Sequence, residues 1–443
     1  MRGALQIINT KSKKIYIPDE YRLPIAFFAM PLLPEYLAPL VTFVPFVFLV
    51  KKFRDKELSF KFANEQILLL LFLIWQFIGV FHSANKADSL AFSFLWVFMF
   101  VGFVWLPYFV KDRESLKKVV YAISLGGGLA GCIGVGQVFL MHYGHYIWEP
   151  LATVFNPFWG LLDSFLVKIG VEYLLPKSLL ALLPHNAPIR IDARASSTFT
   201  NPIFLASYMV MTLPFAVYSI GTAKRKRFKA LAFLCVVAIV GGVAGSYSRA
   251  PYLALGVTVF IMLFMGWKYA LSVLAATPAF LIILPSGVYK RLLTLLDLND
   301  GSIVTRADVW SACMETFRKK WLIGLGPGVG NTRQILINQY GIFQPHAHSL
   351  FLQLYLEGGV IGGTLFLALI VWIFVDIIIL YARSKQNRPL AVTFFASLTG
   401  FLVCGITDYV LYGPKILQFF MLFLGLVVAA KRIYAPKGGE NES

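Results

Sequence analysis

Two histidines and, further upstream, an arginine precede a long apolar segment of this 443-residue chain. His346 and His348 immediately precede the apolar run, and Arg306 lies in the polar stretch ahead of them. An imidazole accepts or relays a proton near neutral pH. A guanidinium holds a phosphate through paired hydrogen bonds without needing a metal. This combination, placed where a membrane segment begins, indicates chemistry on a phosphate-bearing lipid at the membrane surface.

The composition is that of an integral membrane protein. The chain is 58% hydrophobic and only 14% charged, with a mean hydropathy of +0.71. Soluble domains carry about 25% charged residues. We therefore expect an all-α polytopic membrane protein with about twelve spans of about 20 apolar residues each. The expected spans are two in a hairpin within 23–50, then 67–83, 89–110, 119–142, 202–221, 229–246, 250–267, 269–286, 348–381, 389–408 and 416–431.

The expected organisation is one membrane domain over residues 1–443 with two long outer loops, 143–201 and 287–347. The second loop carries several of the candidate site residues. The first is rich in aromatic side chains, which either anchor it at headgroup level or line a lateral entrance for a lipid. The long, polar and basic N-terminus argues against a cleavable signal peptide.

The net charge of +18 is explained by topology. If both termini are cytoplasmic, most Lys and Arg fall in inner segments or in the two long outer loops, which is the positive-inside pattern. Only Lys86, Arg249 and Lys415 fall in short outer loops. The charge therefore does not indicate a nucleic-acid partner. The four cysteines have no paired spacing, which argues against a disulfide framework or a metal site.

Arg249 lies in a short turn between two expected spans. An arginine at membrane level is costly and is a candidate functional residue. The alternative is that it reaches the interface and serves as an anchor. Its outer position opposes the charge rule, which favours function. Arg194 precedes the Asn201-Pro202 pair, and a proline there is typical of a helix start.

The second outer loop contains an amphipathic stretch from Arg306 to Phe317, in which apolar residues recur at three- and four-residue spacing. The apolar positions are Val309, Trp310, Cys313 and Phe317. Arg306 has an alternative reading as a surface partner of Asp308. The glycine-rich run 324–330 lacks the Lys-Ser or Lys-Thr of a nucleotide-binding loop, and indicates a bend with close backbone approach.

The two histidines are separated by one residue. If a helix begins near Pro345, side chains two positions apart point in different directions, so the two histidines cannot easily serve one site. A single interfacial histidine can also be an ordinary polar anchor; the nearby arginines favour catalysis. Glu357 lies inside the apolar run and needs a partner if ionised, or else packs beside Gly358 and Gly359.

Taken in order, these motifs resemble the O-antigen ligase and polymerase superfamily. The motifs that carry the resemblance cover about 190 to 365, and are Arg194 with Asn201-Pro202, Ser248-Arg249, Arg306 with Trp310, Gly324-Leu325-Gly326 with Gly328, and His348-Ser349 with Leu352 and Glu357-Gly358. The resemblance implies a GT-C-like fold and a metal-independent, inverting glycosyltransferase without a cofactor. It also implies an undecaprenyl-diphosphate-linked glycan donor and a site facing the periplasm from a bacterial inner membrane.

The acceptor differs between branches of this superfamily. Ligases transfer the glycan to lipid A–core oligosaccharide, polymerases to another carrier-linked glycan, and a third branch to protein hydroxyls. We favour the ligase over the polymerase on resemblance alone. The short stretch after the last span disfavours the protein-glycosylating branch.

Carried over by position, the resemblance gives each residue a role. His348 matches the histidine proposed to activate the acceptor hydroxyl. Arg249 and Arg306 match arginines proposed to hold the diphosphate. Arg194 matches a basic position, and Lys86 a further phosphate contact. Four residues are expected to support the site, namely His346, Ser349, Glu357 and Asn201. The family usually has Asn where Ser349 and Ile203 stand here.

A transporter or flippase is the more distant alternative. It predicts two related halves with broken helices near the membrane midplane, and the sequence shows no such halves. Glu357 and Asp408 are the main carboxylates within the expected spans, too few for a proton relay. A polysaccharide-binding or export component is a further alternative.

Overall fold

The computed structural model describes residues 19–35, 37–38, 62–143, 194–276 and 301–435. Within this part, every regular element is helical, and eight helices are long and apolar enough to cross a membrane. They are α3 (Asn64–His82), α4 (Lys86–Phe109), α5 (Arg113–Tyr143), α9 (Pro202–Thr222), α10 (Lys226–Gly245), α16 (Leu350–Arg383), α17 (Arg388–Thr407) and α18 (Pro414–Ile433). The expected all-α, multi-span architecture is confirmed at this level.

Shorter helices complete the described part. They are α1 (Asp19–Ala29), η1 (Met30–Leu32), α11 (Arg249–Phe264), η2 (Lys268–Ala270), α14 (Gly301–Lys319), α15 (Val329–Tyr340) and η4 (Val410–Tyr412). The expected span at 250–267 corresponds to α11, which is apolar but has only 16 residues. Residues 39–50 of the expected first hairpin, 144–193 of the first long loop and 277–300 lie outside the described residues. The count of twelve spans and the GT-C class therefore stay predictions.

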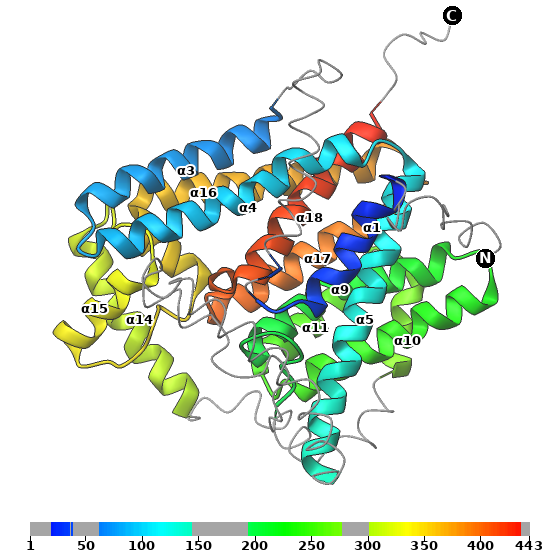
Figure 1. The fold of residues 1–443 in the computed structure, drawn as a ribbon, viewed down its shortest axis with the longest axis horizontal. Helices are drawn as coiled ribbons and strands as arrows, with labels where there is room; N and C mark the ends of the chain where they lie inside the picture. Colours follow the sequence, from blue (N-terminus) through cyan, green and yellow to red (C-terminus); the bar gives the residue numbers. More distant parts are fainter. Residues whose placement is uncertain (1–18, 36, 39–61, 144–193, 277–300, 436–443) are drawn as a thin grey trace, which may run out of the picture.

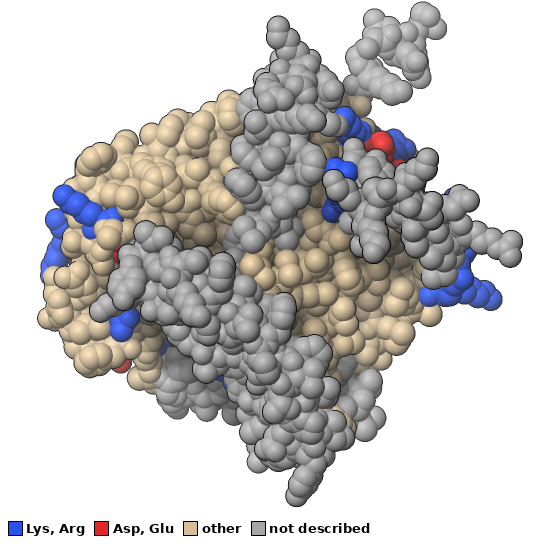
Figure 2. Space-filling model, viewed as in Figure 1, with Lys and Arg blue, Asp and Glu red and all other residues tan. Residues whose placement is uncertain are grey.

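The bundle is built around α9 and α18, whose most apolar windows are 89% and 83% buried. α17 and α18 lie between two groups of helices (Figure 1). On one side, α3 contacts α4 and α16, and α18 contacts α4. On the other, α5 contacts α1, α9 and α10, and α11 contacts α17. Lys and Arg gather at opposite ends of the visible face, with an uncharged band between them (Figure 2).

The two ends of the bundle carry different residues. Tyr412, just after α17, contacts Phe92 near the start of α4, Phe204 near the start of α9 and His346, at ring distances of 6.0, 6.4 and 5.7 Å. These helices therefore begin at the same end, where α17 ends. We call this the histidine end. The opposite end carries basic residues at 111–118, 224–229, 383–388 and 431–432, and we call it the basic end.

Small residues let α5 approach its neighbours closely. A side chain at Gly131 would overlap the carbonyl oxygen of Ala238 on α10, and a Cβ at Gly128 would lie 2.7 Å from Cys235 Sγ. Van der Waals contact between closely approaching backbones drives helix association in lipid, where the hydrophobic effect between helices is absent. This glycine face joins α5 to α10.

A small cap, made of α14, α15 and the segment between α15 and α16, lies at the histidine end and has its own apolar core. Val309 and Cys313 of α14 are buried against Leu336 of α15, Ala347 and Leu356. The other two apolar positions of the predicted amphipathic stretch also pack against this core. The predicted amphipathic helix is therefore confirmed.

The cap is docked on a break in α16. Gly359 has φ 61° and ψ −165°, which interrupts the helix. The freed carbonyl oxygens of Leu356 and Glu357 accept hydrogen bonds from the N–H groups of Leu325 (2.8 Å) and Gly326 (3.0 Å). A Cβ at Gly324 would lie 2.5 Å from the Glu357 carbonyl oxygen, so only glycine permits this approach. The glycine-rich run is a bend with close backbone contact, as predicted.

Candidate active site

A carboxylate and two imidazoles form the centre of the histidine end. Asp408 follows the last residue of α17, and its two oxygens lie 3.9 Å from His346 Nε2 and 3.9 Å from His348 Nδ1. The two histidine rings are 4.4 Å apart. Asp408 and His346 are buried, whereas the His348 side chain keeps 20% of its surface exposed. His348 is thus the member of the cluster that a substrate can reach.

The backbone before α16 explains how both rings face one carboxylate. The helix begins at Leu350, and Ser349 caps it by accepting a hydrogen bond from Leu352 N–H at 3.4 Å. His348 precedes the cap with φ +48°, a left-handed conformation that turns its side chain back toward His346. The expectation that the two histidines diverge from a helix starting near Pro345 is therefore wrong.

Hydrogen bonds assign the proton on His346. Its Nδ1 accepts from the backbone N–H of His348 at 3.1 Å. Burial lowers the pKa of His346 to about 4, so the ring is neutral at pH 7. A neutral ring that accepts at Nδ1 carries its proton on Nε2, and that proton faces Asp408. His346 therefore presents a donor to the carboxylate.

Asp408 is held as an anion. Burial alone would raise its pKa, but the neighbouring His348, His346 and Arg306 outweigh burial and lower the pKa below its ordinary value. Arg306 lies in the first turns of α14, and its Nε donates to the carbonyl oxygen of Thr407 at 3.1 Å. Trp310, one turn further along α14, donates from Nε1 to the carbonyl oxygen of His348 at 3.3 Å. α14 therefore positions both Asp408 and His348.

The outer nitrogen of His348 faces a second side chain. His348 Nε2 lies 2.9 Å from Gln344 Oε1. Because Nδ1 faces Asp408, Nε2 is the nitrogen directed away from the buried carboxylate. The 3.9 Å between Nδ1 and Asp408 Oδ2 is longer than a hydrogen bond, and Nε2 beside an amide oxygen is a donor. His348 can accept a proton at Nε2 once Gln344 is displaced and the ring proton lies on Nδ1, toward Asp408.

A buried network under the histidine segment fixes its position. Gln353 Oε1 accepts from the backbone N–H of Ala347 at 2.9 Å. Its amide nitrogen donates to Thr332 Oγ1 (3.0 Å) and to Glu357 Oε1 (2.8 Å). Glu357, expected to need a partner if ionised, thus accepts a hydrogen bond from Gln353, one turn earlier in the same helix. Through Gln353, these residues hold the segment that carries both histidines.

A second cluster joins Arg194 to the turn that carries Arg249. Arg194 Nε donates to the carbonyl oxygen of Ser246 at 2.8 Å, and its Nη2 donates to Ser248 Oγ at 2.7 Å. Ser248 is the N-cap residue of α11, which begins at Arg249. Arg194 therefore braces the backbone that presents Arg249.

Both clusters lie at the histidine end. α11 contacts α17, and Thr258 of α11 faces Gly400 of α17. α11 starts where α17 ends, so the two helices run in opposite directions. At a rise of about 1.5 Å per residue, Arg249 and Thr407 lie at about the same height. The structure does not place Arg194 and Arg249 in contact with His348, and their convergence on one cavity stays a prediction.

The remaining predicted residues occupy the same end. Lys86 is the exposed first residue of α4. Next to it, Asn85 N–H donates to Asn331 Oδ1 at 2.9 Å, and Gly330 N–H donates to Asp88 Oδ2 at 2.8 Å, which ties this turn to the cap. Asn201 is the N-cap of α9 and accepts from Ile203 N–H at 2.8 Å. The predicted helix start at Asn201-Pro202 is confirmed.

The sequence predicted that Lys415 lies in a short outer loop, and this prediction is wrong. It is fully buried in the first turn of α18. Its Nζ donates to the carbonyl oxygen (2.8 Å) and the hydroxyl (2.9 Å) of Thr198, and lies 4.0 Å from Glu35. The expectation failed because hydropathy cannot show that a buried carbonyl and carboxylate compensate this cation. Lys415 anchors the segment that follows Arg194.

His346, His348 and Asp408 also form a group that could hold a metal ion, with ligand atoms within 4.8 Å of one another. A metal such as zinc needs each nitrogen or oxygen at about 2.0–2.2 Å, with a lone pair directed at the ion. His346 Nε2 carries a proton toward Asp408 instead. The hydrogen bonds therefore favour a proton-handling cluster over a metal site.

Asp408 and Gln353 are the site residues that the sequence did not reveal. Asp408 stood out only as a carboxylate at the end of an apolar run, and Gln353 carried no motif. Sequence spacing predicts a contact only for the Gln353–Glu357 pair, which is at i,i+4 on one helix. The other partners of Asp408 and Gln353 are not related to them by any helical spacing.

Comparison with known proteins agrees with the motif reading. A family model described as O-antigen ligase matches residues 233–367, a range that contains Arg249, Arg306 and both histidines. A comparison with curated proteins gave no match. The matched range begins within α10 and ends within α16, so it includes the cap and the histidine segment. Residues 233–367 of this membrane protein are therefore similar to the O-antigen ligase family, in agreement with the resemblance that the order of its motifs indicated.

Proposed function

We propose that this protein is an O-antigen ligase-type glycosyltransferase. It moves a glycan from undecaprenyl diphosphate to lipid A–core oligosaccharide, at the periplasmic face of a bacterial inner membrane. The family match supports transfer of a lipid-linked glycan by a membrane enzyme. The single observation that carries the proposal is the pairing of a partly exposed His348 with a buried anionic Asp408 beside Arg306.

In the proposed reaction, His348 Nε2 is the base. The acceptor hydroxyl takes the place now held by Gln344 and, with the ring proton on Nδ1 toward Asp408, gives its own proton to Nε2. Its oxygen bonds to the anomeric carbon while the carbon–oxygen bond to the diphosphate breaks, and the electron pair leaves with the diphosphate. Attack from the opposite face inverts the configuration. Asp408 stabilises the imidazolium that forms, and such a base contributes about 10²–10⁴-fold to the rate.

The arginines act on the leaving group. Arg249 and Arg306 stabilise the negative charge that develops on the departing diphosphate, a contribution that is often the largest in enzymes. Arg194 supports Arg249 by fixing its turn. Lys86, exposed at the start of α4, contributes a further positive charge to the approach of the carrier.

The decisive experiment offers the purified protein a carrier-linked glycan and one acceptor at a time, without divalent metal. Lipid A–core oligosaccharide is one acceptor and a second carrier-linked glycan is the other. Glycan on lipid A–core supports the ligase. Extension of the carrier-linked glycan alone would assign a polymerase, the other activity consistent with the family.

Two variants test the residues. His348→Ala lowers transfer by about 10²–10⁴-fold with donor binding retained. His82→Ala, at an exposed histidine on the same end of the bundle, keeps wild-type transfer. Full activity of His348→Ala would remove the assigned base.

Arg249→Lys also loses most of its transfer, because an ammonium cannot reproduce the paired hydrogen bonds of a guanidinium. Arg318→Lys, at an exposed arginine near the end of α14, is the matched control. A wild-type rate of glycan transfer in Arg249→Lys would indicate that Arg249 is an interfacial anchor and does not hold the diphosphate.

A further inference from the structure

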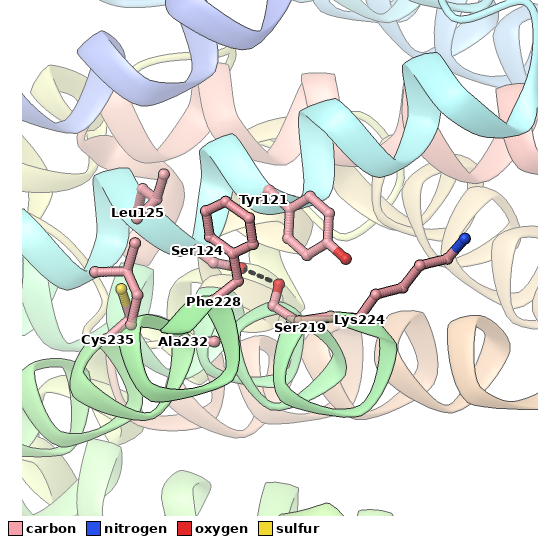
Figure 3. Close-up of a pocket in the computed structure, with 10 residues that line it drawn as sticks. Tyr121, Ser124, Leu125, Ser219, Lys224, Phe228, Ala232 and Cys235 are labelled. Carbon is pink, nitrogen blue, oxygen red and sulfur yellow. Dashed lines mark hydrogen bonds between the residues drawn. The ribbon is translucent and has the colours of Figure 1, made fainter. Parts of the chain in front are cut away.

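A pocket lies at the basic end of the bundle, far along the helices from the histidines. It has a volume of about 240 Å³ and is formed by α5, by the last turns of α9 and by the first turns of α10 (Figure 3). Tyr121 and Leu125 of α5 face Phe228 and Leu231 of α10 across it. None of the candidate active-site residues lines it.

The polar groups inside the pocket already have partners. The hydroxyls of Ser124 and Ser219 lie 2.9 Å apart, as the dashed line in Figure 3 shows. The Tyr121 hydroxyl lies 3.3 Å from that of Thr222. A cavity whose polar groups are satisfied and whose remaining walls are apolar has little to offer a water molecule, and is suited to a hydrocarbon ligand.

The pocket is on the lipid-facing side of the bundle. Of its lining residues, Leu125, Phe228 and Leu231 are 36%, 49% and 42% exposed. In a helix of such apolar composition these surfaces face hydrocarbon. An acyl chain can therefore enter from the membrane without crossing a polar barrier.

The rim of the pocket is strongly basic. Lys224 lines it and extends away from the apolar walls (Figure 3). It starts the run Lys224-Arg225-Lys226-Arg227, all four of which are exposed. This run contains no carboxylate that would neutralise it. Basic pockets between membrane helices attract anionic headgroups, at about 1 kcal/mol for each lysine or arginine near the surface.

From this geometry we propose that the pocket binds one anionic membrane phospholipid, with an acyl chain between α5 and α10 and the headgroup phosphate at Lys224. The basic rim selects an anionic over a zwitterionic headgroup, and the apolar walls hold the chain. Because the lipid contacts both helices, it strengthens the α5–α10 unit. This site does not depend on the identity of the glycan acceptor.

The test uses full-length protein, delipidated in detergent and then offered phosphatidylglycerol or phosphatidylethanolamine with matched chains. Lipid retention is measured by native mass spectrometry and stability by the thermal unfolding midpoint. We expect one phosphatidylglycerol to be retained in preference to phosphatidylethanolamine, and to raise the midpoint more, since a ligand that binds only the folded state stabilises it.

Two pairs of variants separate the headgroup from the chain. Lys224→Gln lowers phosphatidylglycerol affinity about fivefold, whereas Lys226→Gln, with the same charge change outside the lining, retains most of it. Ala232→Trp fills the pocket and lowers retention of both lipids. Ala230→Trp, on another face of the same helix, is its control.

Three results would overturn the proposal. Equal retention of the two lipids by the wild type would remove headgroup recognition. An equal loss in Lys224→Gln and Lys226→Gln would indicate a diffuse field of charge instead of a site. Unchanged retention in Ala232→Trp would place the acyl chain outside the pocket; if that variant does not fold, the lysine pair decides alone.

Discussion

The two ends of the bundle hold their polar residues in different ways. In the described residues, three non-glycine residues have positive φ: Ser197 (53°), Tyr247 (51°) and His348 (48°). All three lie at the histidine end, in the segments that carry Arg194, Arg249 and His348. At the basic end, Ser124, Ser219 and Thr222 donate to carbonyl oxygens four residues earlier in their own helices.

This difference indicates that the histidine end is built to position particular side chains, whereas the basic end is built for helix packing. A residue in a disfavoured backbone conformation costs about 1–3 kcal/mol, and persists only when surrounding contacts determine it. At the histidine end, those contacts are long-range hydrogen bonds such as Arg194 to Ser248 and Ala347 to Gln353. At the basic end, hydrogen bonds within regular helices suffice. Substitutions at the first should affect transfer, and substitutions at the second should affect stability.

The largest effect is expected from Asp408→Asn. An amide keeps the shape of the side chain but cannot stabilise an imidazolium at His348, so transfer should fall by about 10²–10⁴-fold. The rate of glycan transfer at saturating donor measures this. Asp308→Asn, at an exposed aspartate of α14, serves as the control. An Asp408→Asn enzyme with more than a tenth of wild-type activity would exclude this role.

The next effect is on stability below neutral pH. The unfolded chain protonates His346 below its ordinary pKa of 6.5, whereas burial keeps the folded ring neutral down to about 4. The unfolded state therefore binds more protons in this window, and the free energy of unfolding should decrease by about 3 kcal/mol from pH 6.5 to pH 4.

Thermal unfolding midpoints across this pH range give the measurement. His346→Gln should flatten the dependence, while His82→Gln, at an exposed histidine, should retain it. An identical pH profile in His346→Gln and the wild type would contradict the assignment. Asp408 also lowers the free energy of unfolding as the pH falls, but only below its ordinary pKa of 3.8, because its pKa in the folded protein is lowered.

A smaller loss of stability is expected between the two ends, from Gly131→Val on the glycine face that joins α5 to α10. The added side chain would collide with the backbone of α10 and should cost about 1–3 kcal/mol. Gly136→Val on the same helix is the control, because a Cβ there meets nothing within 4 Å. The thermal midpoint is the readout. Equal midpoints in the two variants would mean that α5 and α10 do not depend on this contact.

The smallest effect is expected from a chelator. Because the proton on His346 Nε2 faces Asp408, the cluster offers no complete set of lone pairs to a metal. Glycan transfer should therefore change less than twofold in excess EDTA. If EDTA abolishes transfer and one divalent metal restores it, the histidine cluster is a metal site and this prediction is wrong.

Local features of this protein were accessible from the amino-acid sequence. Hydropathy predicted the spans that α3, α4 and α9 now occupy, because burial in lipid requires long apolar helices. Asn201-Pro202 predicted the start of α9, and the spacing of Val309 and Cys313 predicted an amphipathic helix. The same local motifs, taken in order, indicated the family that residues 233–367 match.

Only the tertiary structure decided which of these residues meet. Asp408 lies sixty residues after His348 (348 to 408), and Arg194 lies on a different segment from Ser248, so no periodicity relates them. The left-handed backbone at His348 and the burial of Lys415 likewise depend on neighbours from other helices. Propensity and hydropathy report on a residue and its near neighbours, whereas the ionisation and direction of a side chain are set by whatever the fold packs against it.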